Sequence, residues 1–304
     1  MKFKKDRSKA RYGIETFHSN PSKPFLLLAI LQGMEEGKIV SPLIEPSSYL
    51  EQTFWEYSNC LDIGRKRDMW LPFYHMHGEH GWTLRRHDNR DPGQDGQPKS
   101  THRLRERYRG AEISDEYFSL YSDSSKRKLL IQDILTENFH PDTHQTIKDL
   151  ERISILSNRY AEDILEMKPV KSEASEKAVR DSGFRKAIQK AYNHTCAFTG
   201  LRLQTPSFHT IIDAAHIVPW SVSHDDSLGN GIALSKNCHW AFDKGMISVD
   251  EDRRILVSSR ITDERMNAPE LINLNGDKVL PPSSDYAAPS ELAFEYHRNK
   301  IFIE

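Results

Sequence analysis

The segment from Ile211 to Gly245, IIDAAHIVPWSVSHDDSLGNGIALSKNCHWAFDKG, constrains the fold of this chain more than any other stretch. The apolar run IIDAAHIV ends at a proline, a polar loop follows, and a second apolar run, GIAL, precedes SKNCHWAFDKG. Short apolar runs bounded by Pro, Gly, Asn, Asp and Ser are typical of strands joined by a loop. A serine before a run that ends at glycine predicts a capped helix. The segment therefore predicts strand, loop, strand and helix within 35 residues.

Three polar residues of this segment are candidates for a catalytic or metal-binding site. His216 is on the first predicted strand, Asn230 ends the loop, and His239 is on the predicted helix, at separations of 14 and then 9 residues. A structural zinc site would need four ligands, often from Cys-x-x-Cys pairs. Position 199, three after Cys196, is threonine, and Cys238 has no neighbouring cysteine. A mixed site from Cys196, Cys238 and a histidine stays as the less favoured alternative.

The segment resembles the HNH nucleases, whose ββα-metal motif carries His, Asn and His at about these separations. The matching stretches are AAHIVPW (Ala214–Trp220), Asp226 with NGIAL (Asn230–Leu234), and HWAFDKG (His239–Gly245). The likeness continues through SVDEDRRILVSSR and the terminal EYHRNKIF, so that it covers roughly residues 184–302. It implies a C-terminal ββα-metal fold and metal-dependent hydrolysis of phosphodiester bonds in DNA.

The resemblance also implies a role for each of the three residues. His216 matches the general base, and a neutral imidazole can take a proton from water near neutral pH. His239 matches a ligand of one divalent cation, which stabilises developing negative charge as a Lewis acid. Asn230 matches the residue that braces the loop and orients the base. Oxygen-rich ligation favours Mg²⁺ or Mn²⁺ over an ion that prefers thiolates.

The metal site departs from the commonest HNH pattern at one position. Many HNH proteins place a metal-ligating His or Asp directly before the base, whereas Ala215 stands there in this chain. Asp213 is three residues before His216, on the opposite face of a regular strand, and would need a bulge to join the site. Asp243 is four residues after His239 on the same helical face, where it could also be a helix-end hydrogen-bond acceptor. Both carboxylates stay candidate ligands.

The organisation of the chain predicts two domains. Its 304 residues are enough for two, and helical patterns dominate the first half. The polar segment KPVKSEASEKAV (Lys168–Val179) predicts a linker. We therefore predict an α+β protein with a helix-rich N-terminal DNA-recognition domain (residues 1–167), a linker (168–180) and the nuclease domain (181–304).

The first domain has a resemblance of its own. SKPFLLLAIL (Ser22–Leu31), a predicted helix, precedes WLPFYHMHGEHGWTL (Trp70–Leu84), where a proline and two glycines predict a short strand, a turn and another strand. Together these stretches resemble the DNA sulfur-binding domain of McrA-type type IV restriction enzymes, which recognises phosphorothioate DNA. The likeness covers about residues 17–84.

By position, the resemblance places Leu71, Pro72 and His75 in a sulfur pocket and Lys23 against a phosphate at a helix start. Sulfur is less strongly hydrated than oxygen, so an apolar pocket would accept it and leave ordinary phosphate without a partner. Leu71 and His75 depart from the aromatic and small residues found at these places. The alternative is that residues 71–74 form only a core strand. His102 and Arg103, in a basic loop, are further candidate DNA contacts.

Composition bounds the remaining classes. Hydrophobic residues make up 37% of the chain and charged residues 28%, which is typical of globular proteins. PFLLLAIL, the longest apolar run, is too short to span a bilayer. Three scattered cysteines do not form a disulfide framework, so we expect a cytoplasmic protein without a membrane partner. The net charge is −2, yet residues 1–11 and 99–109 are basic enough to contact DNA locally.

The two resemblances together imply a modification-dependent restriction endonuclease that acts on double-stranded DNA. We expect it to form a homodimer at least on DNA. One alternative is an HNH nuclease of phage defence triggered by a nucleotide second messenger or by a modified base. A flipped base would need an aromatic cage, for which Trp55, Tyr57, Trp70 and Trp82 are available. An alternative of another class is a non-catalytic DNA-binding protein.

Overall fold

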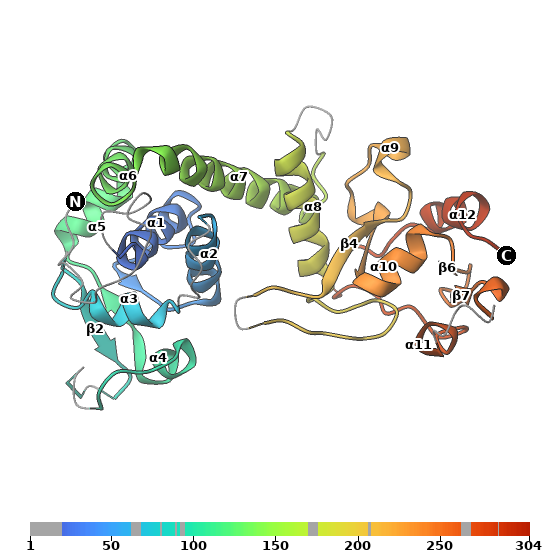
Figure 1. The fold of residues 1–304 in the computed structure, drawn as a ribbon, viewed down its shortest axis with the longest axis horizontal. Helices are drawn as coiled ribbons and strands as arrows, with labels where there is room; N and C mark the ends of the chain where they lie inside the picture. Colours follow the sequence, from blue (N-terminus) through green and yellow to red (C-terminus); the bar gives the residue numbers. More distant parts are fainter. Residues whose placement is uncertain are drawn as a thin grey trace. The chain divides into compact units, whose positions relative to one another are not determined.

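A computed structural model describes residues 20–61, 68–79, 81–88, 90–91, 95–169, 176–205, 208–262, 269–284 and 286–304. The chain divides into two compact units, residues 1–152 and 153–304 (Figure 1). Helices and small antiparallel sheets make up both units, so the predicted α+β class is confirmed. Among the described residues, no helix is long and apolar enough to cross a membrane. The basic residues 1–11 lie outside the described part of the chain.

Helix α1 (Ser22–Glu35) forms the centre of the first unit, as its apolar sequence predicts. Residues 24–33 are all buried, because a helix that is apolar on every side must be covered on every side. It contacts α2 (Ser48–Asn59), α3 (Trp70–His75), α5 (Asp115–Ser122) and α6 (Ser124–Asn138), which surround it in Figure 1. Gly37 ends the helix with a left-handed φ of 67°.

A three-stranded antiparallel sheet completes this unit in the order β1-β3-β2. Its strands are β1 (Leu43–Ile44), β2 (Thr83–Arg86) and β3 (Tyr108–Glu112). Helix α4 (Thr101–Arg107) leads directly into β3, and the Ser100 hydroxyl accepts a hydrogen bond from the Arg103 amide at the start of α4. The basic run that we assigned to a loop therefore forms a helix and a strand.

The prediction of a strand across WLPFYH is wrong, because these residues form α3 (Trp70–His75). Pro72 falls in the first turn, where a helix has no partner for the missing N–H. The turn and the second strand are confirmed. Gly78 and Gly81 adopt φ angles of 79° and 69°, and β2 follows. Trp82 packs edge-on against Phe73 and fixes this turn against the core.

Helix α7 (Pro141–Leu165) contains the boundary between the two units, which falls after residue 152. The boundary predicted from composition lay further along the chain, in the polar segment 168–180. Residues 170–175 of that segment lie outside the described residues. The linker at residues 168–180 and the domain bounds on either side of it stay a prediction.

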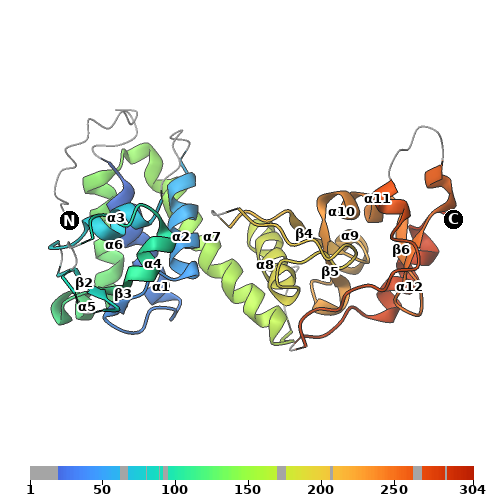
Figure 2. The same ribbon diagram turned by 90° about the horizontal axis from the view of Figure 1, so that it is seen from below.

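The second unit places a β-hairpin between helices. Figure 2 shows α8 and α10 near the two strands, and both helices contact both strands of the hairpin. The elements after α7 are α8 (Lys177–Ala191), β4 (Ile212–His216), α9 (Trp220–Ser223), η2 (Leu228–Asn230), β5 (Gly231–Ser235), α10 (Lys236–Asp243), β6 (Ile247–Val249), β7 (Ile255–Val257), η3 (Ser259–Thr262), α11 (Pro269–Ile272) and α12 (Glu291–Lys300). The predicted order of strand, loop, strand and helix is confirmed.

Two glycines allow close packing around this hairpin. Gly231 pairs with His216 across the two strands, and a Cβ on Gly231 would lie 2.2 Å from the Ile188 side chain of α8. Gly245 ends the turn after α10 with a φ of 70°, and its Cβ would lie 2.0 Å from the Ile301 carbonyl oxygen. The glycines therefore let α8 and the C-terminal segment approach the strands and α10 directly.

Candidate active site

His216, the last residue of β4, is held on two sides. Its Nε2 lies 2.7 Å from Oδ1 of Asp226, and its ring stacks on Phe184 of α8 with centroids 3.8 Å apart. The small cross-strand neighbour Gly231 leaves α8 room to bring Phe184 this close. The His216 side chain keeps 22% of its surface exposed, whereas the Asp226 side chain keeps none. One edge of the imidazole is thus bound to a buried carboxylate.

Asp226 has further partners from two helices. The Tyr160 hydroxyl of α7 donates to its Oδ2 at 2.7 Å, and Nε of Arg180, on α8, lies 3.7 Å from the same oxygen. Arg180 also pairs with Asp181 and stacks 3.6 Å above the Trp220 ring. Burial, followed by the hydrogen bond to Asp226, raises the pKa of Tyr160 well above its ordinary value. The phenol therefore stays protonated and donates, while Asp226 accepts.

Asn230 braces the loop between the strands through both ends of its amide. Its Oδ1 accepts from the Val218 amide at 2.8 Å, and its Nδ2 donates to the carbonyls of Val218 and Asp225, each at 3.0 Å. Nδ2 also lies 3.2 Å from Oγ of Ser223. The residue is only 2% exposed. These bonds join the residues after β4 to those before η2.

His239, on α10, lies between the two candidate carboxylates. Its Nδ1 is 3.5 Å from Oδ2 of Asp213, and its Nε2 is 3.4 Å from Oδ2 of Asp243. Asp213 also binds Nζ of Lys236 at 3.1 Å. Asp213 and His216 have different partners, as the opposite faces of a regular strand require. In the described part of the chain, no hydrogen bond, ion pair or ring contact joins His216 to His239.

The His239 ring presents a different nitrogen to each carboxylate, so one cation bound to one nitrogen would use only one of them. A carboxylate oxygen and a ring nitrogen 3.5 Å apart can share an ion, because each metal–ligand bond is about 2.0–2.1 Å long. The pair of Asp213 and His239 thus fits a divalent cation that keeps several waters. Across the described residues, no three His, Cys, Asp or Glu side chains are grouped to hold a metal.

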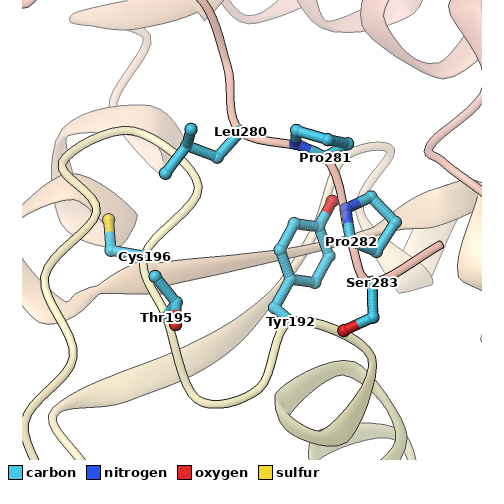
Figure 3. A pocket seen from close by; sticks show the side chains of 7 residues that line it. All are labelled: Tyr192, Thr195, Cys196, Leu280, Pro281, Pro282 and Ser283. Atoms are coloured by element: carbon cyan, nitrogen blue, oxygen red, sulfur yellow. The ribbon is translucent and has the colours of Figure 1, made fainter.

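The two cysteines considered for zinc lie near one another in the core without a third ligand among the described residues. A hydrogen bond with Cys238 lowers the pKa of Cys196, and the same contact together with burial raises the pKa of Cys238. Cys196 also borders a pocket of about 260 Å³, shown in Figure 3. The pocket is lined by Tyr192, Thr195, Cys196, Leu280, Pro281, Pro282 and Ser283, of which only Cys196 was considered above as a candidate ligand.

In the first unit, α3 presents two of the predicted sulfur-pocket residues on one exposed face. Leu71 is 41% exposed, His75 is also exposed, and the two are four positions apart on the helix. Pro72 is buried toward the core. Lys23, the predicted phosphate contact, is in the first turn of α1 and forms an ion pair with the buried Glu79.

The remaining predicted DNA contacts lie on the surface of α4. His102 and Arg103 are highly exposed, and both pair with Glu106, at 3.1 and 2.8 Å. Of the aromatic residues proposed for a base cage, Trp55, Tyr57 and Trp82 are buried, and the Trp82 indole donates to the Phe73 carbonyl at 3.0 Å.

Comparison with known proteins bears on the second unit. Residues 196–250 match the family described as HNH endonuclease. The matching segment lies within the second unit. It contains His216, Asn230 and His239, on β4, η2 and α10. The match supports a nuclease, as the sequence predicted.

Other comparisons add little. No curated protein is significantly similar to this chain. A solved structure, the modification-dependent TagI restriction endonuclease, aligns with 39% of this chain and 37% of its own, at 20% identity and a TM-score of 0.28. A likeness this weak carries no argument about activity.

Sequence reasoning missed the partners of His216. Asp226 belongs to the HNH-like pattern that we identified, but the pattern assigned it no role. Tyr160 lies 66 positions from Asp226, on α7, and Arg180 was assigned to the end of the linker. No local signal marks either residue, because only tertiary packing brings them to the hairpin.

Proposed function

We propose that this protein is a modification-dependent DNA endonuclease whose second unit hydrolyses phosphodiester bonds. The observation that carries the proposal is the HNH endonuclease match over residues 196–250, inside which the three predicted residues lie on strand, loop end and helix. The first unit, in this proposal, recognises duplex DNA that carries a phosphorothioate.

His216 acts as the general base in this proposal, because an imidazole can take a proton from water near neutral pH. Asn230 keeps the loop after β4 in place through its four contacts with Val218, Ser223 and Asp225. Asp213 and His239 would hold a divalent cation, Mg²⁺ or Mn²⁺, which supplies Lewis-acid stabilisation of charge on the phosphate and the leaving oxygen. Asp243 is the alternative carboxylate, on the other ring nitrogen of His239.

Cleavage of plasmid DNA with Mg²⁺ or Mn²⁺ tests the nuclease. We expect His216→Ala and His239→Ala to lose cleavage, and the exposed His224→Ala, in the same loop, to retain it. Retained cleavage by His216→Ala would contradict the assignment of the base. If the wild type and all variants fail to cleave the plasmid, the nuclease proposal itself is contradicted.

Support for sulfur recognition comes from the exposed face of α3, where the apolar Leu71 side chain lies beside His75. An apolar surface accepts the weakly hydrated sulfur at a lower desolvation cost than a phosphate oxygen. Lys23 already pairs with the buried Glu79 and keeps 19% of its side chain exposed, whereas His102 and Arg103 lie on the surface of α4.

Binding to two duplexes that differ only in one phosphorothioate tests this part of the proposal. We expect tighter binding of the sulfur-containing duplex, and loss of that preference in Leu71→Asp. Val40→Asp, at another exposed apolar residue of the same unit, is the matched control. Equal affinity of the wild type for both duplexes would remove sulfur recognition and leave the nuclease proposal intact.

Cutting both strands requires two active sites or two successive events, so we propose a homodimer on DNA. Light scattering with a modified duplex should then give the mass of two chains per duplex. A monomeric complex that cuts both strands would contradict the dimer.

A further inference from the structure

Asp226 is a buried carboxylate to which the nuclease family pattern gives no role. One of its side-chain partners is the candidate base, His216. Its Oδ1 binds His216, and its Oδ2 binds Tyr160. We propose that Asp226 is a positioning residue that fixes the tautomer and orientation of His216, so that Nδ1 is the atom that takes the proton. This inference rests on the proposed nuclease function.

The choice of Nδ1 follows from which edge of the ring Asp226 occupies. A carboxylate only accepts hydrogen bonds, so at 2.7 Å the Nε2 of His216 must be the protonated nitrogen. The lone pair of the neutral ring then belongs to Nδ1. The Asp226 side chain is fully buried while 22% of the His216 side chain is exposed, so the ring keeps some access to solvent although its Nε2 is occupied.

Proton transfer fits this arrangement without a change at Nε2. His216 Nδ1 takes one proton from the attacking water as its oxygen bonds to phosphorus and the bond from phosphorus to the leaving oxygen breaks. The leaving oxygen takes a proton from solvent. The imidazolium then carries a proton on each nitrogen, and the charge of Asp226 stabilises it. Nδ1 later releases its proton to solvent, which restores the starting tautomer.

The groups around Asp226 keep it an acceptor. Tyr160 donates to Oδ2, and the Arg180 guanidinium lies 3.7 Å from the same oxygen. Asp181 is the other charged group beside Arg180. A hydrogen-bond donor and a positive charge therefore both face the oxygen of Asp226 that does not contact His216. Phe184 covers one face of the His216 ring, so the ring has little freedom to rotate away.

A purely structural role for Asp226 in the loop is less well supported, because Asn230 already provides that bracing. Asn230 bonds to the backbone of Val218 and Asp225 across the loop. The contacts described for the Asp226 carboxylate, by contrast, are with the side chains of Tyr160, Arg180 and His216.

Asp226→Asn in the full chain tests the proposal. The amide keeps the shape but can donate toward Nε2, which favours the wrong tautomer. We expect kcat to fall by up to about 10⁴-fold, the loss seen when the orienting carboxylate of a Ser-His-Asp triad becomes an amide, with KM unchanged because the Asp226 side chain is fully buried. Asp252→Asn, at an exposed residue of the same unit, should leave kcat unchanged. Tyr160→Phe keeps the carboxylate on His216 and should lower kcat by less than Asp226→Asn.

Two readouts separate positioning from stability. The shape of the pH–rate profile should change in Asp226→Asn, because the carboxylate no longer faces the imidazole, whereas a loss of stability alone would leave that shape unchanged. Nitrogen NMR of His216, which requires no cleavage, should find the proton on Nε2 in the wild type and on Nδ1 in Asp226→Asn.

Wild-type kcat in a folded Asp226→Asn variant would overturn the proposal while leaving the nuclease intact. If Asp226→Asn does not fold, nitrogen NMR of the wild type still tests the proposal. A proton on Nδ1 of His216 in the wild type would overturn the proposal. A wild type that cuts no DNA but keeps its proton on Nε2 would instead refute the nuclease and retain the Asp226–His216 pair.

Discussion

Replacing Asn230 by alanine should release the loop between β4 and β5 and abolish cleavage. The amide makes three close hydrogen bonds with the backbone and a longer contact with Ser223, all in a residue that is 2% exposed. A hydrogen bond contributes about 0.5–1.5 kcal/mol net, and buried groups left unpaired cost more. The expected loss of local stability is therefore about 2–4 kcal/mol.

Hydrogen exchange is the suitable assay, because a chain of two units need not unfold in one step. A loss of about 2–4 kcal/mol corresponds to exchange about 30- to 1,000-fold faster, and we expect it in peptides that cover residues 217–230. The Val218 amide, which donates to Oδ1, should report the change most directly. Peptides from the first unit should be unaffected.

Two further variants make the test specific. Asn230→Asp keeps the volume and the bond from Val218, but it places a carboxylate oxygen against the Val218 and Asp225 carbonyls, so it should be as damaging as alanine. Asn273→Ala, at an exposed residue of the same unit, should change stability by no more than about 0.5 kcal/mol. Exchange in Asn230→Ala equal to that in Asn273→Ala would refute the reasoning.

Two predictions concern the support of α10. Burial lowers the pKa of His297 from 6.5 to about 4, so below pH 6.5 the unfolded chain binds a proton that the folded chain excludes. The free energy of unfolding should thus have its highest value above pH 6.5 and fall by about 3 kcal/mol as the pH drops to about 4. Denaturant titrations at pH 7 and pH 4.5 should show a smaller loss in His297→Gln, and equal losses would contradict this. Gly245→Ala should lower the melting temperature more than Gly276→Ala. Both glycines have positive φ, but only a Cβ at Gly245 meets a carbonyl, 2.0 Å away at Ile301, while none lies near Gly276. Equal melting temperatures would show that the contact at Ile301 relaxes without cost.

Local sequence determined much of this protein. The apolar run of α1, the order of hairpin and helix, and the places of His216, Asn230 and His239 follow from patterns within a few dozen residues. Helical and strand periodicity, capping serines and turn glycines all act over that range. The error at WLPFYH has the same origin, because a proline can begin a helix as readily as it can end a strand.

Tertiary structure alone decided what surrounds the catalytic candidates. Asp226 reaches His216 only because the loop folds back, and Tyr160 reaches Asp226 from a helix 66 positions earlier in the chain. The two nitrogens of the His239 ring face different carboxylates, Asp213 and Asp243. A cation bound to one of these nitrogens would therefore use only one of the two carboxylates. The contact of Tyr160 with Asp226 depends on packing between distant segments, and no periodic or spacing signal in the sequence marks Tyr160 as a neighbour of the site.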